Sequence, residues 1–197
     1  IGIAYASAPF QTTAPHGSTE ARFCTNPMAY GIPTQDRPII LDMSTSAMAY
    51  YGLIEAKTAN KSVAPGIGYN KNGNPTQNPA EIMAGAIKTF GGHKGSGLAL
   101  VVQIFAAAFV QAESFNSDSH NAGNLIMAID PEILTTRKAF TKEVSSIIRG
   151  IKSARKSPGV TEILIPGEQS NRFNTEVLNA GKIEVEDNLY KELKKVG

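Results

Sequence analysis

The residues best suited to chemistry lie in one glycine-rich stretch, Gly91 to Gly97, with the sequence GGHKGSG. His93 and Lys94 stand between glycines, directly before an almost wholly apolar segment that predicts a helix. Glycines let a ligand approach the backbone closely, and the N–H groups at a helix start carry about half a positive charge. The stretch therefore favours an anion such as a phosphate, and the simpler alternative is a tight turn with a solvent-facing lysine.

Two common phosphate-binding motifs do not fit this stretch. A P-loop ends in a glycine followed by lysine and then serine or threonine, whereas here Lys94 precedes Gly95. The dinucleotide fingerprint G-x-G-x-x-G begins correctly at Gly95 and Gly97, but Leu100 occupies the position of the third glycine. The sequence therefore predicts no ordinary Rossmann site.

A second candidate is the segment ILDMSTS, in which Asp42 ends an apolar run and a series of hydroxyl residues follows. One interpretation is that Asp42, Ser44 or Ser46 caps a following helix. The other places these side chains around a ribose or phosphate at the carboxyl end of a strand, where ligands bind in α/β sheets. The residues alone leave both interpretations open.

A third candidate is Glu168, which follows a predicted strand over 161–165 and precedes a predicted helix that Gly181 closes. Arg172 lies one helical turn further on. An ion pair between Glu168 and Arg172 is one interpretation, and a carboxylate that binds ribose is the other. The sequence pattern does not decide between these two interpretations of Glu168.

Other kinds of site are not indicated. His16, His93 and His120 are far apart in sequence, and no C-x-x-C or carboxylate cluster is present, so no metal site is predicted. The G-x-S-x-G elbow of a serine hydrolase is also absent. Cys24 is the only cysteine and its apolar context makes it a poor nucleophile. A single thiol forms no internal disulfide, so we expect a reducing compartment and a cytoplasmic protein.

The amino-acid composition indicates which kinds of binding partner can be expected. The chain has 197 residues, of which 42 % are hydrophobic, and its 19 basic and 17 acidic residues give a net charge of +2. Such a balance predicts neither nucleic-acid nor membrane binding. The longest apolar run, from Leu98 to Ala112, is interrupted by Gln103 and is shorter than the roughly 20 residues of a membrane span. It predicts a buried core helix instead.

Strands and helices alternate irregularly along the chain. This mixture without a strict βαβ rhythm predicts an α/β fold with a mixed sheet and flanking helices. The predicted strands cover 1–7, 24–33, 37–43, 124–130, 161–165 and 182–186, and the predicted helices cover 47–60, 80–88, 93–112, 131–155, 171–181 and 187–196.

Six motifs in order carry a resemblance to a known family: CTNPMAYGIP, IILDMSTSAMAYYG, NGNPTQNP, FGGHKGSGLAL, NLIMAID and ILIPGE. Together they resemble the second, non-Rossmann family of malate/L-lactate dehydrogenases, which also contains ureidoglycolate and sulfolactate dehydrogenases and diketogulonate reductase. The resemblance implies hydride transfer between NAD or NADP and a 2-oxo/2-hydroxy acid pair. It also implies a family-specific NAD(P)-binding fold and a homodimer.

The resemblance also assigns residues. It implies that Thr25 and Asn26 line the substrate pocket and that Asp42 can assist catalysis. The residues that it places in the cofactor site are Ile40, Leu41, Asp42, Met43, Ser44, Thr45, Ser46, His93, Lys94, Gly167, Glu168 and Gln169.

The 197 residues correspond to roughly the C-terminal three-fifths of such a subunit and hold most of its cofactor-binding region. Relatives carry a helical N-terminal region whose S-H-G histidine donates the proton, and these 197 residues contain no S-H-G segment. We therefore expect that region, or a second chain, to complete the enzyme, and residues 1–197 alone to be inactive. The alternative is a catalytically silent remnant that acts as a nucleotide-binding or dimerisation module.

Overall fold

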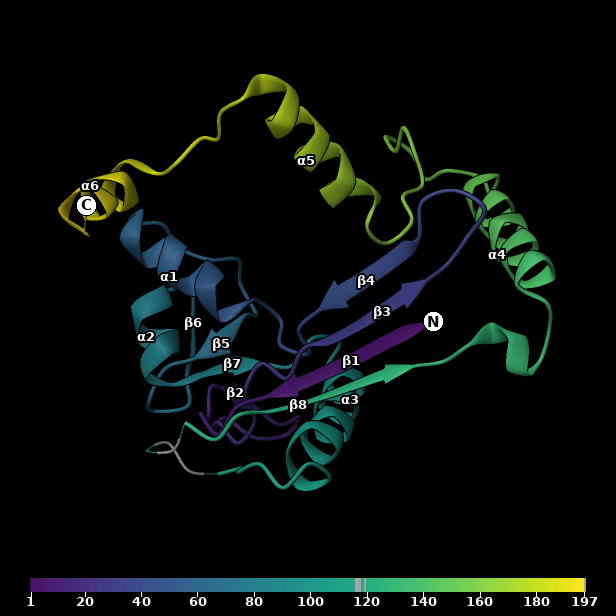
Figure 1. The fold of residues 1–197 in the computed structure, drawn as a ribbon. Coiled ribbons are helices and arrows are strands. Elements are labelled where there is room, and N and C mark those ends of the chain that lie inside the picture. Colours follow the sequence, from purple (N-terminus) through teal and green to yellow (C-terminus); the bar gives the residue numbers. More distant parts are fainter. Residues whose placement is uncertain (116–117, 119, 197) are drawn as a thin grey trace. The chain divides into compact units, whose positions relative to one another are not determined.

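The structure is a computed structural model that describes residues 1–115, 118 and 120–196 (Figure 1). Its contacts divide the chain into two compact units. Unit 1 contains residues 1–4, 29–42 and 126–183, and unit 2 contains residues 5–28, 43–125 and 184–197.

The strands form two four-stranded sheets. One has the order β4-β3-β1-β8, formed by Ile39–Met43, Met28–Ile32, Gly2–Ser7 and Gly123–Ala128 (Figure 1). The other has the order β2-β7-β5-β6, formed by Thr13–Ala14, Ala86–Lys88, Gly68–Tyr69 and Pro75–Thr76. In this second sheet β2 pairs with β7 in parallel, whereas β5 pairs antiparallel with both β6 and β7. The predicted α/β fold with a mixed sheet is confirmed.

Unit 1 contains the short 3₁₀ helix η2, Pro131–Ile133, and two longer helices, α4 (Arg137–Lys152) and α5 (Glu168–Ala180). The single helix predicted over 131–155 is wrong at its start, because Thr136 caps α4 by accepting a hydrogen bond from the Ala139 N–H at 3.2 Å. Gly181 closes α5 in the left-handed conformation, as predicted. The strand predicted over 161–165 does not form, and these residues are irregular.

Unit 2 packs helices α1 (Tyr50–Thr58) and α2 (Pro79–Ala84) around a core of Leu53, Val63, Ile82 and Ile87. The helix predicted over 80–88 ends early, because at Gly85 the backbone turns into β7. A Cβ atom at Gly85 would overlap the carbonyl of Tyr69, so the close approach requires glycine.

The last helix of unit 2, α6 (Asp187–Val196), is capped by the residue that precedes it. The carboxylate of Glu186, not that of Asp187, accepts hydrogen bonds from the N–H groups of Asn188 and Leu189, both at 2.9 Å. The strand predicted over 182–186 is irregular instead.

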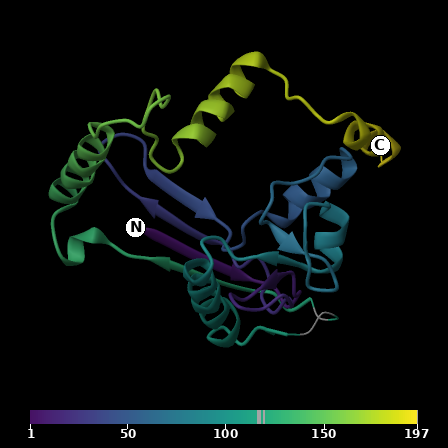
Figure 2. The ribbon, with the colours of Figure 1, turned by 180° about the vertical axis from the view of Figure 1, so that it is seen from behind.

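Helix α3, His93–Gln103, continues into a single turn of π-helix, η1, Ile104–Ala108. Within unit 2 this teal helical segment (Figure 2) approaches the end of β1, where the rings of Tyr5 and Phe105 stack at 5.8 Å. Gly123 on β8 makes this approach possible, since a Cβ there would overlap the carbonyl of Ala106.

The expectation of a fully buried core helix at this place is only half right. Ala99, Val102 and Ala106 are buried, but Leu100 and Phe109 are 51 % and 69 % exposed. Over the described residues, no helix combines the length and the apolar character needed to cross a membrane.

Candidate functional site

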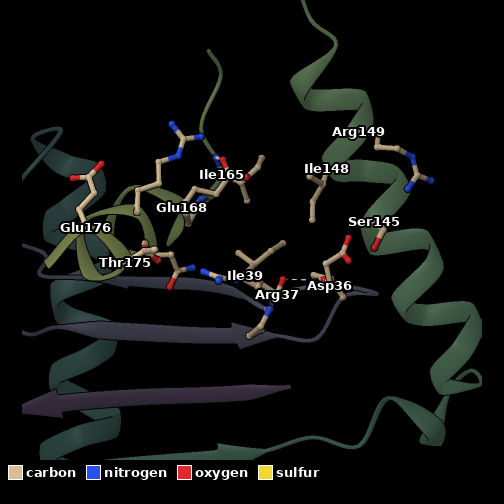
Figure 3. A pocket seen from close by; sticks show the side chains of 15 residues that line it. Asp36, Arg37, Ile39, Ser145, Ile148, Arg149, Ile165, Glu168, Thr175 and Glu176 are labelled. Atoms are coloured by element: carbon tan, nitrogen blue, oxygen red, sulfur yellow. Dashed lines mark hydrogen bonds between the residues drawn. The ribbon is translucent and has the colours of Figure 1, made fainter. Parts of the chain in front are cut away.

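Unit 1 contains a cleft of about 760 Å³ beside the edge strand β4 (Figure 3). Apolar side chains of Ile39, Ile148 and Ile165 face it, and charged side chains surround them. The lining residues are Thr34, Asp36, Arg37, Pro38, Ile39, Ser145, Ile148, Arg149, Ile165, Pro166, Glu168, Asn171, Arg172, Thr175 and Glu176.

The walls of this cleft are held by hydrogen bonds between elements far apart in sequence. Ser145 on α4 is buried, and its hydroxyl accepts a hydrogen bond from the Gln35 N–H at 3.1 Å. The Thr34 hydroxyl accepts from the Asp36 N–H and donates to the Arg37 carbonyl, both at 2.9 Å. These bonds set the turn before β4 against the middle of α4.

Gly167 brings two of the predicted cofactor segments together. It has φ +91°, and a Cβ at this position would lie 3.1 Å from the carbonyl oxygen of Ile40. Because only glycine combines this backbone conformation with so close an approach, the turn before α5 lies directly against β4. Segments 40–42 and 167–169 are therefore neighbours within unit 1.

Asp42 is exposed on this edge strand. Ile40 and Asp42 are exposed along β4, whereas Ile39, Leu41 and Met43 are half-buried, which is the alternation expected of a strand with one covered face. Within the described residues the Asp42 carboxylate makes no hydrogen bond or ion pair.

Capping does not explain the hydroxyl residues after Asp42. Helix α1 begins only at Tyr50, and its N-cap, Ala49, provides no side-chain bond. The hydroxyl of Ser46 lies 2.7 Å from the carbonyl of Met48 and 3.0 Å from the Ser44 hydroxyl, so these groups are bonded within their own loop. The interpretation of Asp42, Ser44 and Ser46 as helix caps is therefore wrong.

Glu168 belongs to an ion-pair network, but with a different partner from the one predicted. Its carboxylate accepts hydrogen bonds from Lys152 Nζ at 2.7 and 2.9 Å and from the Ile165 N–H at 2.9 Å. Arg172 instead binds Glu162 at 2.6 Å, and Lys152 also approaches Glu162 at 3.3 Å. The network joins the end of α4 to the start of α5 and uses the Glu168 carboxylate, whereas the neighbouring Gln169 side chain is exposed.

The network shifts the pKa values of its members. The hydrogen bond from Lys152 lowers the pKa of Glu168, and the bond from Arg172 lowers the pKa of Glu162. The bond to Glu168 raises the pKa of Lys152. All three groups are therefore held in their charged forms at neutral pH.

In unit 2, the loop before His93 and Lys94 is hydrogen-bonded to the segment that follows Asp42. The Phe90 N–H donates to the Thr45 carbonyl at 3.1 Å, and the Thr89 hydroxyl donates to the Gly92 carbonyl at 3.0 Å. Gly91 and Gly92 have φ +57° and +61°, so the chain turns sharply into α3. His93 and Lys94 are exposed in its first turn, and Lys94 has no ion pair within the described part of the chain.

The predicted substrate residues differ in burial: Thr25 is partly exposed and Asn26 is buried. Asn26 is completely buried, and its amide donates to the Ala99 carbonyl at 2.9 Å and to Gln103 Oε1 at 2.7 Å. The Thr45 hydroxyl lies within bonding distance of the carbonyls of both residues, at 3.0 Å from Thr25 and 3.1 Å from Asn26. Asn26 therefore contributes to the core of unit 2, and only Thr25 is partly exposed.

These features define an α/β protein without a Rossmann motif. Asp42 is exposed on β4, and Gln169 and Lys94 are exposed after the glycine turns at Gly167 and at Gly91–Gly92. A sequence profile of the malate/L-lactate dehydrogenase family matches residues 1–194. The chain therefore belongs to the malate/L-lactate dehydrogenase family, which confirms the resemblance seen in its motifs.

Individual relatives agree with this assignment. The chain is 35 % identical to the malate/(S)-sulfolactate dehydrogenase of Methanothermus fervidus, over 93 % of this chain and 55 % of that protein. It is 26 % identical to the NAD⁺ ureidoglycolate dehydrogenase of Escherichia coli K12, over 91 % of this chain and 53 % of that protein. The chain thus spans about half the length of the curated relatives that it matches.

Solved structures give the same result. The sulfolactate dehydrogenase of Methanocaldococcus jannaschii superposes with a TM-score of 0.81 at 31 % identity, covering 99 % of this chain and 58 % of that one. The malate dehydrogenase of Pyrococcus horikoshii OT3 superposes with a TM-score of 0.82 at 28 % identity, covering 99 % of this chain and 56 % of that one.

Sequence reasoning missed the cationic side chains around the cleft in unit 1. Arg37 and Arg149 both line it, and Lys152 is the partner of Glu168. Lys152 lies in the last turn of α4, where a basic residue is ordinarily explained by the helix dipole. No local signal indicated that it would meet a carboxylate 16 residues further along the chain.

Proposed function

We propose that this protein is an oxidoreductase that transfers a hydride between NAD(P)H and a 2-oxo acid, with the 2-hydroxy acid as product. The observation that carries the proposal is family membership over residues 1–194, with relatives named as malate, sulfolactate and ureidoglycolate dehydrogenases. In the reducing direction the carbonyl carbon receives the hydride and the carbonyl oxygen receives a proton, and NAD(P)⁺ is released.

The exposed groups of the three cofactor segments suit a dinucleotide. The Lys94 ammonium complements a phosphate, and the Asp42 carboxylate can accept hydrogen bonds from ribose hydroxyls or from a carboxamide. Gly91, Gly92 and Gly167 leave the backbone accessible, and the Gln169 amide can donate or accept. When bound, the nicotinamide supplies or accepts the hydride.

The other residues of these segments have supporting roles in the proposal. Thr45 and Ser46 are buried and hold the loop before His93 in place. Glu168 stabilises the turn of Gly167 through Lys152, which makes it a positioning residue. Thr25 remains the proposed contact for substrate, and the proton donor is proposed to be the S-H-G histidine of the family, on an N-terminal region or a second chain.

We further propose a homodimer in a reducing compartment such as the cytoplasm. Exposed apolar side chains on α3, on η1 and directly after η1 support association, since such patches commonly mark interfaces; among them are Leu100, Val101, Ile104 and Phe109. The single thiol of Cys24 supports the compartment.

The decisive experiment measures dinucleotide binding to the Lys94→Ala variant. A charge-assisted contact to phosphate contributes about 1.5–3 kcal/mol, so the Kd for NADH or NADPH is expected to rise about tenfold or more. The thermal midpoint should not change, because the Lys94 side chain is exposed and unpaired in the described structure. Fluorescence titration with each dinucleotide also distinguishes NAD from NADP.

Lys71→Ala is the matched control, since Lys71 is exposed in the same unit, and it should bind dinucleotide like the wild type. An unchanged Kd in folded Lys94→Ala would contradict the assignment of this loop. Assays of the full-length protein with a panel of 2-oxo acids then test the reaction. Dinucleotide binding without any turnover in that panel would favour the catalytically silent alternative.

A further inference from the structure

Unit 2 contains a cavity of about 380 Å³ that borders the proposed cofactor loop at Gly91 and Gly92 but is lined mostly by residues outside the cofactor segments. It lies between the loop that carries His16 and the strand end that carries Lys88. The lining residues are Ala14, Pro15, His16, Gly17, Ser18, Ala47, Gly66, Tyr69, Lys88, Thr89, Phe90, Gly91 and Gly92.

The ionisable side chains of Lys and His that line this cavity are basic, and none that lines it is acidic. No aspartate or glutamate lines it, and its only basic side chains are Lys88 and His16. Within the described residues, no carboxylate lies within ion-pair distance of Lys88. Since Lys88 is half-buried, its ammonium is partly removed from water without a counter-ion.

The backbone and the Tyr69 ring hold Lys88 in place. The Lys88 N–H donates to the Ile67 carbonyl at 2.8 Å, and its carbonyl accepts from the Ala47 N–H at 2.7 Å. Its Nζ lies 4.5 Å from the centroid of the Tyr69 ring. A cation–π contact orients the ammonium but leaves its charge and its N–H donors available to an anion.

His16 is positioned on the other side of the cavity. Its backbone N–H donates to the Ser96 hydroxyl at 3.1 Å, and its ring lies 5.9 Å from the ring of His93. Gly17 and Gly66 also line the cavity, and an added Cβ at either would meet nothing within 4 Å. Both glycines have positive φ, a backbone conformation that larger residues rarely adopt.

We propose that this cavity binds an oxyanion, a phosphate or carboxylate group, with the Lys88 ammonium as its cation and the His16 imidazole as a further donor. The proposal goes beyond the dinucleotide contacts named above and does not depend on them. The group is either part of a separate small anion or a phosphate of a bound dinucleotide, and the experiment distinguishes these two sources.

The probe is inorganic phosphate, titrated into the purified protein while NMR follows the imidazole signals of its three histidines. We expect the His16 signals to shift saturably. In Lys88→Met the Kd for phosphate should rise about tenfold or more, because a charge-assisted contact is lost. Lys57→Met, which removes an exposed lysine elsewhere in unit 2, should leave the Kd unchanged.

A second arm repeats the titration with saturating NADPH. Loss of phosphate binding identifies the oxyanion as part of the dinucleotide, and unchanged binding identifies a separate small anion. If Lys88→Met does not fold, His16→Gln carries the test, with phosphate binding to the wild type and to this variant measured by titration calorimetry because the His16 signal is lost. His16 is exposed, so its replacement should weaken binding in a folded protein. The absence of a saturable shift at His16, or equal phosphate affinity in the wild type and the folded variant, would overturn the proposal.

Discussion

At the scale of single residues, Asp42 is the position where an effect on ligand binding is most clearly separable from an effect on folding stability. An exposed carboxylate without a hydrogen bond or ion pair in the described structure contributes little to folding. Its place on an edge strand, beside the Gly167 turn, instead leaves it available to a ligand.

Asp42→Asn is therefore expected to change the free energy of unfolding by less than about 0.5 kcal/mol. The Kd for the dinucleotide should rise severalfold. Asparagine keeps the shape of the side chain but lacks the negative charge that strengthens the hydrogen bonds accepted from ribose hydroxyls. Thermal melts and fluorescence titration of the same preparation measure both quantities. A clear loss of stability with unchanged binding would assign Asp42 a structural role.

Asn26 is the opposite case, because its amide lies wholly inside unit 2. Asn26→Ala removes the bonds that the Asn26 amide donates to the Ala99 carbonyl and to Gln103 Oε1, and leaves Gln103 Oε1 with only the Ser7 hydroxyl as donor among the described residues, which costs about 1–3 kcal/mol. The backbone also has φ +40°, a conformation that asparagine tolerates better than alanine. We expect the thermal midpoint to fall by about 2–4 °C for each kcal/mol lost. Asn72→Ala, at an exposed turn, is the control and should melt like the wild type.

At the scale of elements, the network of Lys152, Glu162 and Glu168 connects α4 to α5 and so supports the turn of Gly167. The lowered pKa values of the two glutamates mean that their stabilisation is present above the unfolded value of about 4.3 and is lost as the pH falls through the folded values. The raised pKa of Lys152 means that its stabilisation is present below about 10.4 and is lost as the pH rises through the folded value.

Glu168→Gln should therefore lower the thermal midpoint at neutral pH and have progressively less effect below about pH 4. The loss should be small, a few degrees at most, because the side chains of Glu168 and Lys152 are 31 % and 30 % exposed. Melting curves across pH measure it, with Glu143→Gln on the exposed face of α4 as control. A midpoint difference that is the same at pH 3 and pH 7 would exclude the ion pair as its cause.

At the scale of the whole molecule, the chain spans about half the length of the curated relatives that it matches. A polypeptide of residues 1–197 alone is expected to bind dinucleotide but not to reduce 2-oxo acids. The proton donor implied by the family resemblance is not among these residues, and general acid catalysis contributes about 10²–10⁴-fold. Exposed apolar side chains such as Phe109 should also make this polypeptide associate.

Spectrophotometric assays with NADH or NADPH and several 2-oxo acids test the activity, and sedimentation measures association. Robust turnover by residues 1–197 alone would show that His16, His93 or His120 donates the proton. A strictly monomeric polypeptide would contradict the proposed contribution of the α3 and η1 surface to assembly.

The sequence by itself determined those features that depend on neighbouring residues. The fold class, the family and the helix end at Gly181 were all predictable, because periodicity, motif order and a glycine C-cap are local patterns. Local patterns also showed that the glycine-rich turn at His93 and Lys94 fits neither the P-loop nor the Rossmann motif.

Tertiary structure alone decided which side chains remain available for chemistry. Glu168 is bound by a lysine 16 residues away, and Asn26 is buried under a helix that begins far along the chain. Asp42 is left exposed because it lies on the uncovered face of the edge strand β4. In each case the outcome depends on which distant element packs against the residue, and a residue's own neighbours in sequence carry no information about that contact.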